Sequence, residues 1–436
     1  MFFTSQAILT KNTRNWYYLR QNSSLAKKIA DSKIRTKKIL TKAEVPVPKL
    51  LGVIKNEKEV LEFPWEEIEE GFVVKPGSGF GGEGVLLIRR RAKWAGEWFL
   101  MDGTKINISG LRYHCFDILQ GKFSLHNLPD YVLVEERVKI FGQFLRFTKI
   151  GAPDIRIIIF NQVPVMAMLR IPTEESKGKA NLHQGAIGLG LDMATGITTY
   201  GVYRDQLLEK IYDLKRKKMV KVNGIRIPLW EQVLRTAIAA QKAVSGLNFV
   251  GVDIVLDKEK GPLILELNAR PGLAIQICNQ TGLQERLKRI EGIQVRNEDH
   301  AINISRFLFG GSFVDKVDFK TKVKALSVFE VIKIKTESNK KINIIAKIDT
   351  GAHRTSIDKQ TAKDLGLLKQ DNILYYRHYK SSLGKRHRRP VIGIVFWLRG
   401  RKIITSANVT NRSHLRTKVL IGKRDLQGFT IEIRES

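Results

Sequence analysis

The chain has 436 residues, of which 43% are hydrophobic and 27% charged, and its formal net charge is +32. This composition excludes a disordered or fibrous protein and allows two or three globular domains, each with its own core. The two cysteines, Cys115 and Cys278, form no CxxC pair, and no apolar run approaches the roughly 18 residues of a membrane helix. We therefore expect a cytoplasmic protein that has no disulfides, no zinc–thiolate site and no membrane span.

The positive charge is densest in the last quarter of the chain, where 24 basic residues accompany 9 acidic ones from Ala325 onward. Such an excess favours an anionic partner: nucleic acid, an acidic polymer or an anionic membrane surface. A merely solvated basic surface is the alternative, because the sequence lacks the interleaving of aromatic and basic residues that is typical of RNA-binding segments.

The first predicted element is a helix over residues 24–43, where apolar positions recur at helical spacing among lysines. The two prolines of "VPVPKLLGVI" then end the helix and begin extended chain. Strands are predicted next at Phe72–Lys75 and Gly84–Ile88.

The segment that joins these two strands is rich in glycine, "FVVKPGSGFGGEGVLLI". A Walker loop needs Gly-Lys-Ser/Thr at the start of a helix, and the dinucleotide fingerprint also needs a helix, but here a strand follows. The loop is therefore predicted to be a flap whose backbone N–H groups close over phosphates, with Lys75 at the end of the incoming strand. A bulged hairpin with a solvent-facing lysine is the alternative.

Further strands are predicted at Tyr131–Val138, Arg156–Phe160 and Val163–Arg170, and a helix over residues 230–245. They are followed by "GVDIVLDKEKGPLILELNARPG", which is typical of an antiparallel hairpin with its loop at residues 257–262.

This hairpin carries the strongest functional pattern in the chain. Pairing Leu256 with Leu263 puts Asp253 directly opposite Glu266, and Asn268 projects from the same face as Glu266. Two facing carboxylates on apolar strands repel each other, and a divalent cation between them removes that cost. Three oxygen ligands with room for phosphate oxygens suit Mg²⁺ bound with a nucleotide. Two exposed acids on a surface hairpin are the alternative, but "LILELNA" is too apolar to face solvent throughout.

A domain boundary is predicted near residues 305–325, where a double glycine and alternating charges interrupt the pattern. We expect a first domain over 1–310, a linker over 311–326 and a β-rich domain over 327–436. In the last of these, runs such as "FEVIKIK", "INIIAKID" and "KVLIGK" are typical of strands.

Residues 12–300 resemble the ATP-grasp superfamily, and within it the RimK-like, α-L-glutamate ligase-like proteins associated with sugar transfer. "ADSKIRTKKILTKAEVPVP" is similar to the family's Asp-x-Lys helix and Val-Pro-x-Pro strand entry, and "YVLVEERV" to its adenine hinge. "PDIRIIIF" and "KGKANLHQGAIGLGLD" are similar to its Asp-Ile-Arg strand and its Asn-x-His segment. The resemblance implies an α+β fold in which two subdomains clasp ATP.

The resemblance also implies roles for individual residues. Asp253, Glu266 and Asn268 match the magnesium ligands, with Mn²⁺ as an alternative ion. Arg170 and Arg270 are the catalytic candidates, because an arginine beside the acyl phosphate stabilises the developing oxyanion. The contacts to ATP would come from Lys33, Lys75, Gly79, Gly81, Gly82, Glu135, Glu136, Val138, Arg156, Asn181 and His183.

An enzyme of this kind transfers the γ-phosphoryl group of ATP to a carboxylate, and an amine then attacks the acyl phosphate. We expect a ligase whose partners are ATP, an amino acid such as glutamate, and a peptide or protein acceptor. Two alternatives stay open: an ATP-grasp phosphotransferase that forms no amide, and a basic nucleic-acid-binding protein with a degenerate ATP site.

The C-terminal segment "INIIAKIDTGAHRTSID" ends an apolar run with Asp-Thr-Gly, and "KVLIGK" follows later. These motifs resemble retropepsin-like aspartic proteases, in particular a group named ATP-dependent zinc proteases, which implies a small all-β domain with Asp349 as its catalytic residue. An aspartic protease needs two carboxylates, so a single motif requires a homodimer through this domain. An inactive peptide-binding barrel is the alternative, and His353, His378 and His387 lack tight zinc-ligand spacing.

Overall fold

The computed structural model describes residues 7–78, 82–124, 127–311, 325–380 and 386–432. The chain divides into two compact units. Unit 1 comprises Met1–Phe160, Met166–Leu191 and Thr198–Gln284, and unit 2 comprises Asn161–Val165, Asp192–Ile197 and Glu285–Ser436. Within the described ranges, every helix is too short or too polar to cross a lipid bilayer.

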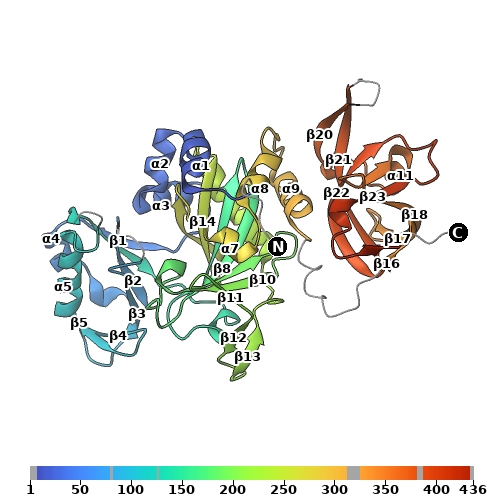
Figure 1. The fold of residues 1–436 in the computed structure, drawn as a ribbon. Coiled ribbons are helices and arrows are strands. Elements are labelled where there is room, and N and C mark those ends of the chain that lie inside the picture. The colour runs from blue at the N-terminus through green and yellow to red at the C-terminus, as the bar shows by residue number, and fades with distance from the viewer. Residues whose placement is uncertain (1–6, 79–81, 125–126, 312–324, 381–385, 433–436) are drawn as a thin grey trace. The chain divides into compact units, whose positions relative to one another are not determined.

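The first part of unit 1 is a six-stranded sheet of order β1-β6-β2-β3-β4-β5, with α4 and α5 beside it (Figure 1). Its core gathers around Trp65, Phe72 and Trp98, which are almost completely buried. The elements are β1 Leu50–Ile54, α4 Glu57–Glu62, β2 Phe72–Pro76, β3 Leu86–Arg91, β4 Glu97–Leu100, β5 Lys105–Asn107, α5 Ile108–Leu119 and β6 Val132–Glu136.

The second part of unit 1 is a seven-stranded sheet of order β11-β10-β9-β8-β7-β14-β15. Helix α6 packs against β7, β14 and β15, and α7 packs against β9 and β10. The turn from β7 to β8 uses Asn161 and Gln162 at φ 47° and 67°, the conformation of a two-residue type I′ turn. The elements are β7 Asp154–Phe160, β8 Val163–Ile171, β9 Ile187–Leu191, β10 Thr198–Tyr203, β11 Gln206–Leu208, α6 Trp230–Ala243, β14 Phe249–Asp257, β15 Gly261–Asn268 and α7 Ile275–Asn279.

The N-terminal residues form short helices rather than the single helix predicted over 24–43. Helix α1 (Lys11–Thr13) is followed by α2 (Ser24–Ala30) and α3 (Lys33–Lys42). The prediction of one helix is wrong because Ser32 is extended and its hydroxyl accepts a hydrogen bond from the backbone N–H of Arg35, at 3.4 Å. This N-cap begins a new helix and directs α3 independently of α2.

The hairpin of β14 and β15 has the predicted pairing of Asp253 with Glu266 but a different register at its tip. There Leu256 pairs with Pro262 rather than Leu263, so the predicted tip register is wrong by one residue. A bulge at Leu265 takes up the extra residue and restores the pairing of the two carboxylates.

Unit 2 contains a seven-stranded sheet of order β17-β18-β23-β19-β22-β21-β20, and an additional pairing of β17 with β21 curls it into a barrel. Strand β23 lies between β18 and β19, parallel to β18 and antiparallel to β19. Its core is mostly aliphatic, with Ile334 and Ile357 completely buried, and it includes the buried ring of Phe396. The elements are β16 Ala325–Leu326, β17 Phe329–Lys335, β18 Lys341–Asp349, β19 Ser356–Asp358, α11 Lys359–Asp364, β20 Ile373–Lys380, β21 Arg386–Leu398, β22 Arg401–Thr410, β23 Val419–Gly422 and β24 Thr430–Ile431.

Helices also belong to unit 2, whose longest segment begins at Glu285 within α8 (Leu283–Ile290) and includes α9 (Glu298–Phe309). Helix α9 packs against β20, β21 and β22. The contacts therefore group α9 with the barrel, whereas the sequence assigns it to the first domain. The predicted linker falls mostly outside the described residues, and its bounds stay a prediction.

Acidification is expected to weaken unit 2 through His300 on α9, a side chain that is 2% exposed. Its Nδ1 accepts a hydrogen bond from the Arg296 N–H at 3.1 Å, and Nε2 lies 2.8 Å from the Leu374 carbonyl oxygen. Only the neutral ring satisfies both contacts, and burial lowers the pKa of His300. Its stabilising contribution is therefore complete above the usual histidine pKa and is lost as the pH falls below it.

The measurement is urea unfolding of the wild type and of His300→Gln at neutral and mildly acidic pH. The glutamine variant should lose part of the pH dependence, because an amide can donate and accept without titrating. An identical pH dependence in both proteins would contradict this role for His300.

Candidate active site

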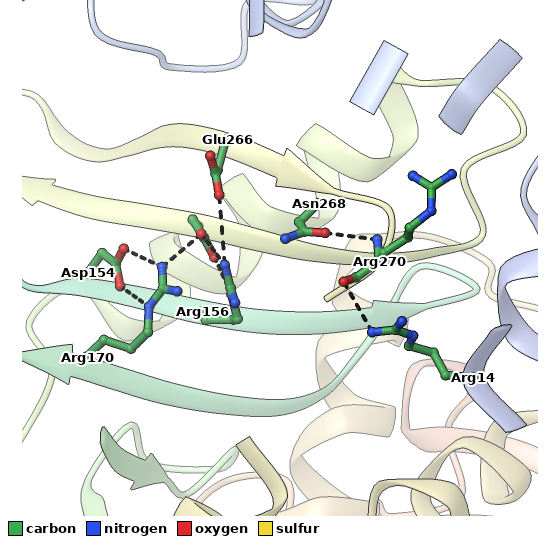
Figure 2. Close-up of polar contacts among 8 residues, drawn as sticks. Arg14, Asp154, Arg156, Arg170, Glu266, Asn268 and Arg270 are labelled. Atoms are coloured by element: carbon green, nitrogen blue, oxygen red, sulfur yellow. Dashed lines mark hydrogen bonds and ion pairs between the residues drawn. The ribbon is translucent and has the colours of Figure 1, made fainter. Parts of the chain in front are cut away.

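The centre of the second sheet of unit 1 carries charged and polar side chains across four neighbouring strands, β8, β7, β14 and β15. The register puts Asp253 opposite Arg156 on one side and opposite Glu266 on the other. Asp154, two residues before Arg156, projects from the same face. Figure 2 shows Asp154, Arg156, Arg170, Glu266 and Asn268 along this row. We call this set, with Asp253, the charged row.

Asp253 is the centre of the charged row, and its side chain is 3% exposed. It accepts two hydrogen bonds from Arg156, Nε to Oδ1 at 2.7 Å and Nη2 to Oδ2 at 2.6 Å. Arg170 Nη2 adds a third at 2.8 Å. Burial opposes ionisation of this carboxyl group, but the two guanidinium groups hold the pKa of Asp253 below its usual value. The carboxylate is thus kept ionised inside the sheet.

Arg170, a predicted catalytic residue, is also almost completely buried, with its side chain 8% exposed. Its Nε donates to Asp154 Oδ1 at 2.6 Å, and Nη2 donates to both Asp154 and Asp253. In this arrangement Arg170 positions two carboxylates. Stabilisation of the oxyanion by Arg170 stays a prediction.

Glu266 is the more accessible of the two facing carboxylates, with its side chain 41% exposed. The nearest guanidinium nitrogen, Arg156 Nη2, lies 3.9 Å away. Desolvation and the neighbouring Asp253 carboxylate raise the pKa of Glu266. This side of the charged row therefore has an excess of negative charge.

The donor set at this point fits a hard divalent cation. Glu266 and Asp253 offer carboxylate oxygens, and Asn268 offers an amide oxygen that also accepts the Arg270 N–H at 2.9 Å. A cation here would offset the repulsion that raises the pKa of Glu266. Among the described residues, this site included, no group of three or more His, Cys, Asp or Glu side chains could hold a metal ion, so the donor set here rests on two carboxylates and an amide.

Two lysines flank a buried glutamate in the first sheet. Glu135 on β6 is 4% exposed and forms ion pairs with Lys37 at 2.7 Å and with Lys75 at 2.8 Å. Burial opposes the charge on Glu135, but the two lysines hold its pKa below the usual value. Burial also lowers the pKa of Lys37 to about 8. Lys37 was not among the predicted contacts, although it lies one helical turn after Lys33 on α3 and therefore on the same face.

Lys33, at the start of α3, joins these two groups of charges. Its Nζ donates to the Pro76 carbonyl oxygen at 3.1 Å, and α3 packs against β15. Burial and the nearby Lys75 lower the pKa of Lys33, whereas Glu266, Asp130 and Glu135 raise it. The helix that carries Lys33 therefore contacts the strand of the predicted metal carboxylates, while Lys33 itself contacts the end of the strand that carries Lys75.

The glycine loop lies next to Lys75, but Gly79 and Gly81 fall outside the described residues. Asp130, which the sequence analysis missed, anchors the start of the loop by accepting the Ser78 N–H at 2.8 Å. Gly82 has φ 78°, and a Cβ on it would lie 3.2 Å from the side chain of Lys179. The described end of the loop thus favours glycine and lies close to a further cation.

The remaining predicted contacts lie outside the charged row. Glu136 accepts the Lys49 N–H at 2.7 Å and pairs with Lys260 at 2.5 Å, and Val138 lies just beyond β6. The side chain of Asn181 caps the short turn at 182–184 by accepting the His183 N–H at 3.1 Å. Among the described residues, no hydrogen bond or ion pair joins Glu136, Asn181 or His183 to the charged row.

Arg270 and Arg14 lie at the end of β15 (Figure 2). Arg270 is half exposed and pairs with Asp31 at 2.6 Å. Arg14, which the sequence analysis missed, donates from Nη1 to the carbonyl oxygens of Pro271 at 2.8 Å and Arg270 at 3.3 Å. Burial and the neighbouring Arg270 lower the pKa of Arg14. The N-terminal segment thus braces the turn that follows Asn268.

In unit 2, Asp349 ends β18 beside Gly422 of the parallel strand β23. Its Oδ1 accepts the backbone N–H groups of Gly351 and Ala352, both at 2.9 Å. The carbonyl oxygen of Ala352 accepts a hydrogen bond from the backbone N–H of Lys423 at 2.8 Å. The Asp-Thr-Gly turn is therefore fixed where the parallel strands β18 and β23 end. The described residues around it contain no cluster of zinc ligands.

Residues 12–292 match the family described as sugar-transfer associated ATP-grasp. Among solved structures, a D-alanine–D-alanine ligase from Bacillus anthracis is 16% identical over 62% of this chain and 65% of its own, with a TM-score of 0.32. The ATP-grasp ligase PsnB, in complex with a precursor variant, Mg and ADP, is 16% identical over 62% of this chain and 61% of its own, with a TM-score of 0.32. This chain spans less than two thirds of either ligase.

Another match covers a smaller share of the chain. Lpg0085 from Legionella pneumophila, a protein of unknown function, is 18% identical over 25% of this chain and 93% of its own, with a TM-score of 0.18. No curated protein matches the chain significantly.

Proposed function

Because residues 12–292 match its model, the chain belongs to the sugar-transfer associated ATP-grasp family, and we propose that unit 1 is an ATP- and Mg²⁺-dependent carboxylate–amine ligase. The observation that carries the proposal is the position of Lys33. Lys33 is partly buried: its Nζ donates to the carbonyl oxygen of Pro76, the neighbour of Lys75, at 3.1 Å, and its helix α3 packs against β15, the strand of Glu266. The lysines that could bind a triphosphate are thereby linked through α3 to the strand of the carboxylates that could bind its metal ion.

The proposed reaction follows from the poor leaving group of a free carboxylate. Transfer of the γ-phosphoryl group of ATP gives an acyl phosphate and ADP, and the substrate amine then attacks the acyl carbon and expels phosphate. Mg²⁺, held by Asp253, Glu266 and Asn268, would neutralise phosphate oxygens, and Mn²⁺ suits the same donors.

The chain's own residues have distinct tasks in this proposal. Lys33 and Lys75 supply positive charge for the phosphates, and Glu135 holds Lys75 in place through the ion pair at 2.8 Å. Arg156 and Arg170 keep Asp253 ionised and oriented. Closure of the glycine loop would exclude water from the acyl phosphate. Arg270 is the exposed arginine nearest Asn268 in the sequence and is proposed to face the acyl phosphate.

We propose an amino acid such as glutamate as one substrate and a peptide or protein as the other. The excess of basic residues favours an acidic acceptor, because opposite charge raises its local concentration at the protein surface. We place the reaction in the cytoplasm, where ATP is available.

An ADP-release screen across amino acids and peptides tests the proposal. ADP release that requires both a carboxylate and an amine, with one amide formed for each ADP, is expected. ADP release without an amine would favour a phosphotransferase. Salt-sensitive RNA binding without any ATP turnover would favour the nucleic-acid-binding alternative.

For unit 2 we propose a retropepsin-like domain that trims or recognises the same product as a homodimer. The support is Asp349, which ends β18 beside the end of the parallel strand β23 and is held by the N–H groups of Gly351 and Ala352. Two copies would supply the two carboxylates that acid–base cleavage of a peptide bond requires.

Asp349→Asn is expected to abolish cleavage of acidic peptides and to leave ADP release unchanged, because the two sites lie in different units. The measurement is mass spectrometry of peptides after incubation with the full chain. A matched control is Asp364→Asn, an exposed carboxylate on α11 of the same unit. Cleavage that persists in Asp349→Asn would exclude the proteolytic role.

A further inference from the structure

A separate two-stranded ribbon projects from unit 1, formed by β12 (Lys210–Asp213) and β13 (Lys218–Lys221) (Figure 1). The register pairs Lys210 with Lys221 and Tyr212 with Met219. Opposed residues of an antiparallel pair, and residues two apart along one strand, point to the same face. These four side chains therefore share one face. We call residues 210–221 the basic ribbon.

The two faces of the basic ribbon differ in burial. Tyr212 and Met219 are 48% and 53% exposed, and Lys210 and Lys221 beside them are exposed as well. On the opposite face Ile211 is buried. The ribbon thus rests on unit 1 through one face and offers solvent a face with an apolar pair between lysines.

The positive charge of the basic ribbon is almost uncompensated. Its one acid, Asp213, is fully buried and accepts a hydrogen bond from Arg146, which lowers the pKa of Asp213 to about 2. Arg216 approaches this carboxylate only to 3.9 Å. The ribbon's six exposed cations are Lys210, Lys215, Arg216, Lys217, Lys218 and Lys221.

We propose that the basic ribbon docks the protein on an anionic lipid surface. Its cations would contact lipid phosphate and serine carboxylate groups, and Tyr212 and Met219 would enter the headgroup region. Leu207, three residues before the ribbon and 64% exposed, adds apolar surface. This docking needs no helix that crosses the bilayer.

The exposed side chains favour lipid over nucleic acid. Proteins that bind single-stranded nucleic acid stack successive bases on several aromatic rings along a basic groove. The ribbon offers one aromatic ring, beside a thioether that has no stacking face. Aliphatic and thioether groups among lysines gain free energy when they enter the interfacial layer of a membrane.

The first test is co-sedimentation of the full chain with vesicles of phosphatidylcholine alone or mixed with phosphatidylserine. Binding to the mixed vesicles only is expected. Each cation near an anionic membrane raises the binding constant by a factor of about five. The triple variant Lys215→Ala/Arg216→Ala/Lys217→Ala should therefore bind the mixed vesicles more weakly by on the order of 100-fold. ADP release by this variant should equal that of the wild type.

A matched control is needed because the chain as a whole is strongly basic. Lys55, Lys58 and Lys93 are exposed lysines elsewhere in unit 1, and their triple alanine variant removes the same charge. This variant is expected to retain most of its vesicle binding. Equal losses in the two triple variants would overturn the proposal, as would a ribbon variant that loses binding to a polyuridine oligonucleotide but keeps its vesicle binding.

The second test reports contact with lipid directly. Cys115 and Cys278 are both buried, so Met219→Cys gives an accessible thiol for an environment-sensitive dye. The dye emission should shift to shorter wavelength with the mixed vesicles, and a dye on Lys58→Cys should show no shift. An unchanged spectrum at position 219 would contradict insertion of this face.

Discussion

Glu266→Gln is expected to reduce ADP release by a factor on the order of 10²–10³, a loss typical of removing one electrostatic group from a reaction centre. Glutamine keeps the size of the side chain and one oxygen donor but removes the negative charge that faces Asp253. The proposed metal ion would then lose a charged ligand. Single-turnover and steady-state ADP release measure the effect.

The same substitution is expected to stabilise the protein when no metal ion is present. Desolvation and Asp253 raise the pKa of Glu266, so the ionised side chain opposes folding. The penalty applies at neutral pH and disappears once the pH falls well below the usual glutamate pKa, where the carboxyl group is protonated in both states. Glu266→Gln should therefore be more stable than the wild type at neutral pH, and the difference should vanish in acid.

A third measurement separates metal binding from folding. Mg²⁺ with ADP should raise the Tm of the wild type, because a ligand that binds only the folded state stabilises it, and should leave that of Glu266→Gln almost unchanged. The matched control is Glu259→Gln on the loop of the same hairpin, a half-exposed side chain paired with Lys139 at 3.1 Å. Full activity in Glu266→Gln would exclude this residue from the metal site.

Arg170→Met is expected to lower the free energy of unfolding by about 3–5 kcal/mol, the cost of removing one partner from a buried ion pair. Asp154 and Asp253 are 6% and 3% exposed. Asp253 would keep Arg156, whereas Asp154 would lose both hydrogen bonds from the guanidinium group. Urea unfolding of unit 1 measures the loss.

A second substitution tests whether the unpaired carboxylate of Asp154 causes the loss of stability. Asp154→Asn in the Arg170→Met background should recover more than half of the lost stability, because an amide carries no charge to bury. Burial raises the pKa of Asp154, and loss of Arg170 removes an influence that lowers it. Protonation in acid should therefore make the defect of Arg170→Met smaller at about pH 5 than at about pH 8.

An exposed ion pair serves as the control for the stability loss expected of Arg170→Met. Arg204 pairs with Glu175 at 3.0 Å, but its side chain is 66% exposed. Arg204→Met should change the stability by less than about 1 kcal/mol, as for most surface ion pairs. If the double variant were as unstable as Arg170→Met alone, loss of packing rather than the unpaired charge would explain the defect.

Much of the candidate site could be predicted because its parts are close in sequence. Asp253 and Glu266 belong to one hairpin, and the two-residue period of a strand together with antiparallel pairing brings them face to face. The bulge at Leu265 could not be predicted, because the tip register depends on how the turn at 258–260 packs. The break between α2 and α3 has a local signal in Ser32, which is a strong N-cap residue.

The α+β character of unit 1, the facing carboxylates and the Asp-Thr-Gly turn at a strand end can all be predicted from the amino-acid sequence, because each follows from neighbours along the chain. Three other features appear only in the folded chain: Lys37 and Lys75 share Glu135, Arg156 and Arg170 neutralise Asp253, and Arg14 reaches the turn after Asn268. These contacts join residues far apart in sequence, and they are stable only when packing excludes water and strengthens each charge pair. Neither the spacing nor the composition of the chain encodes that burial.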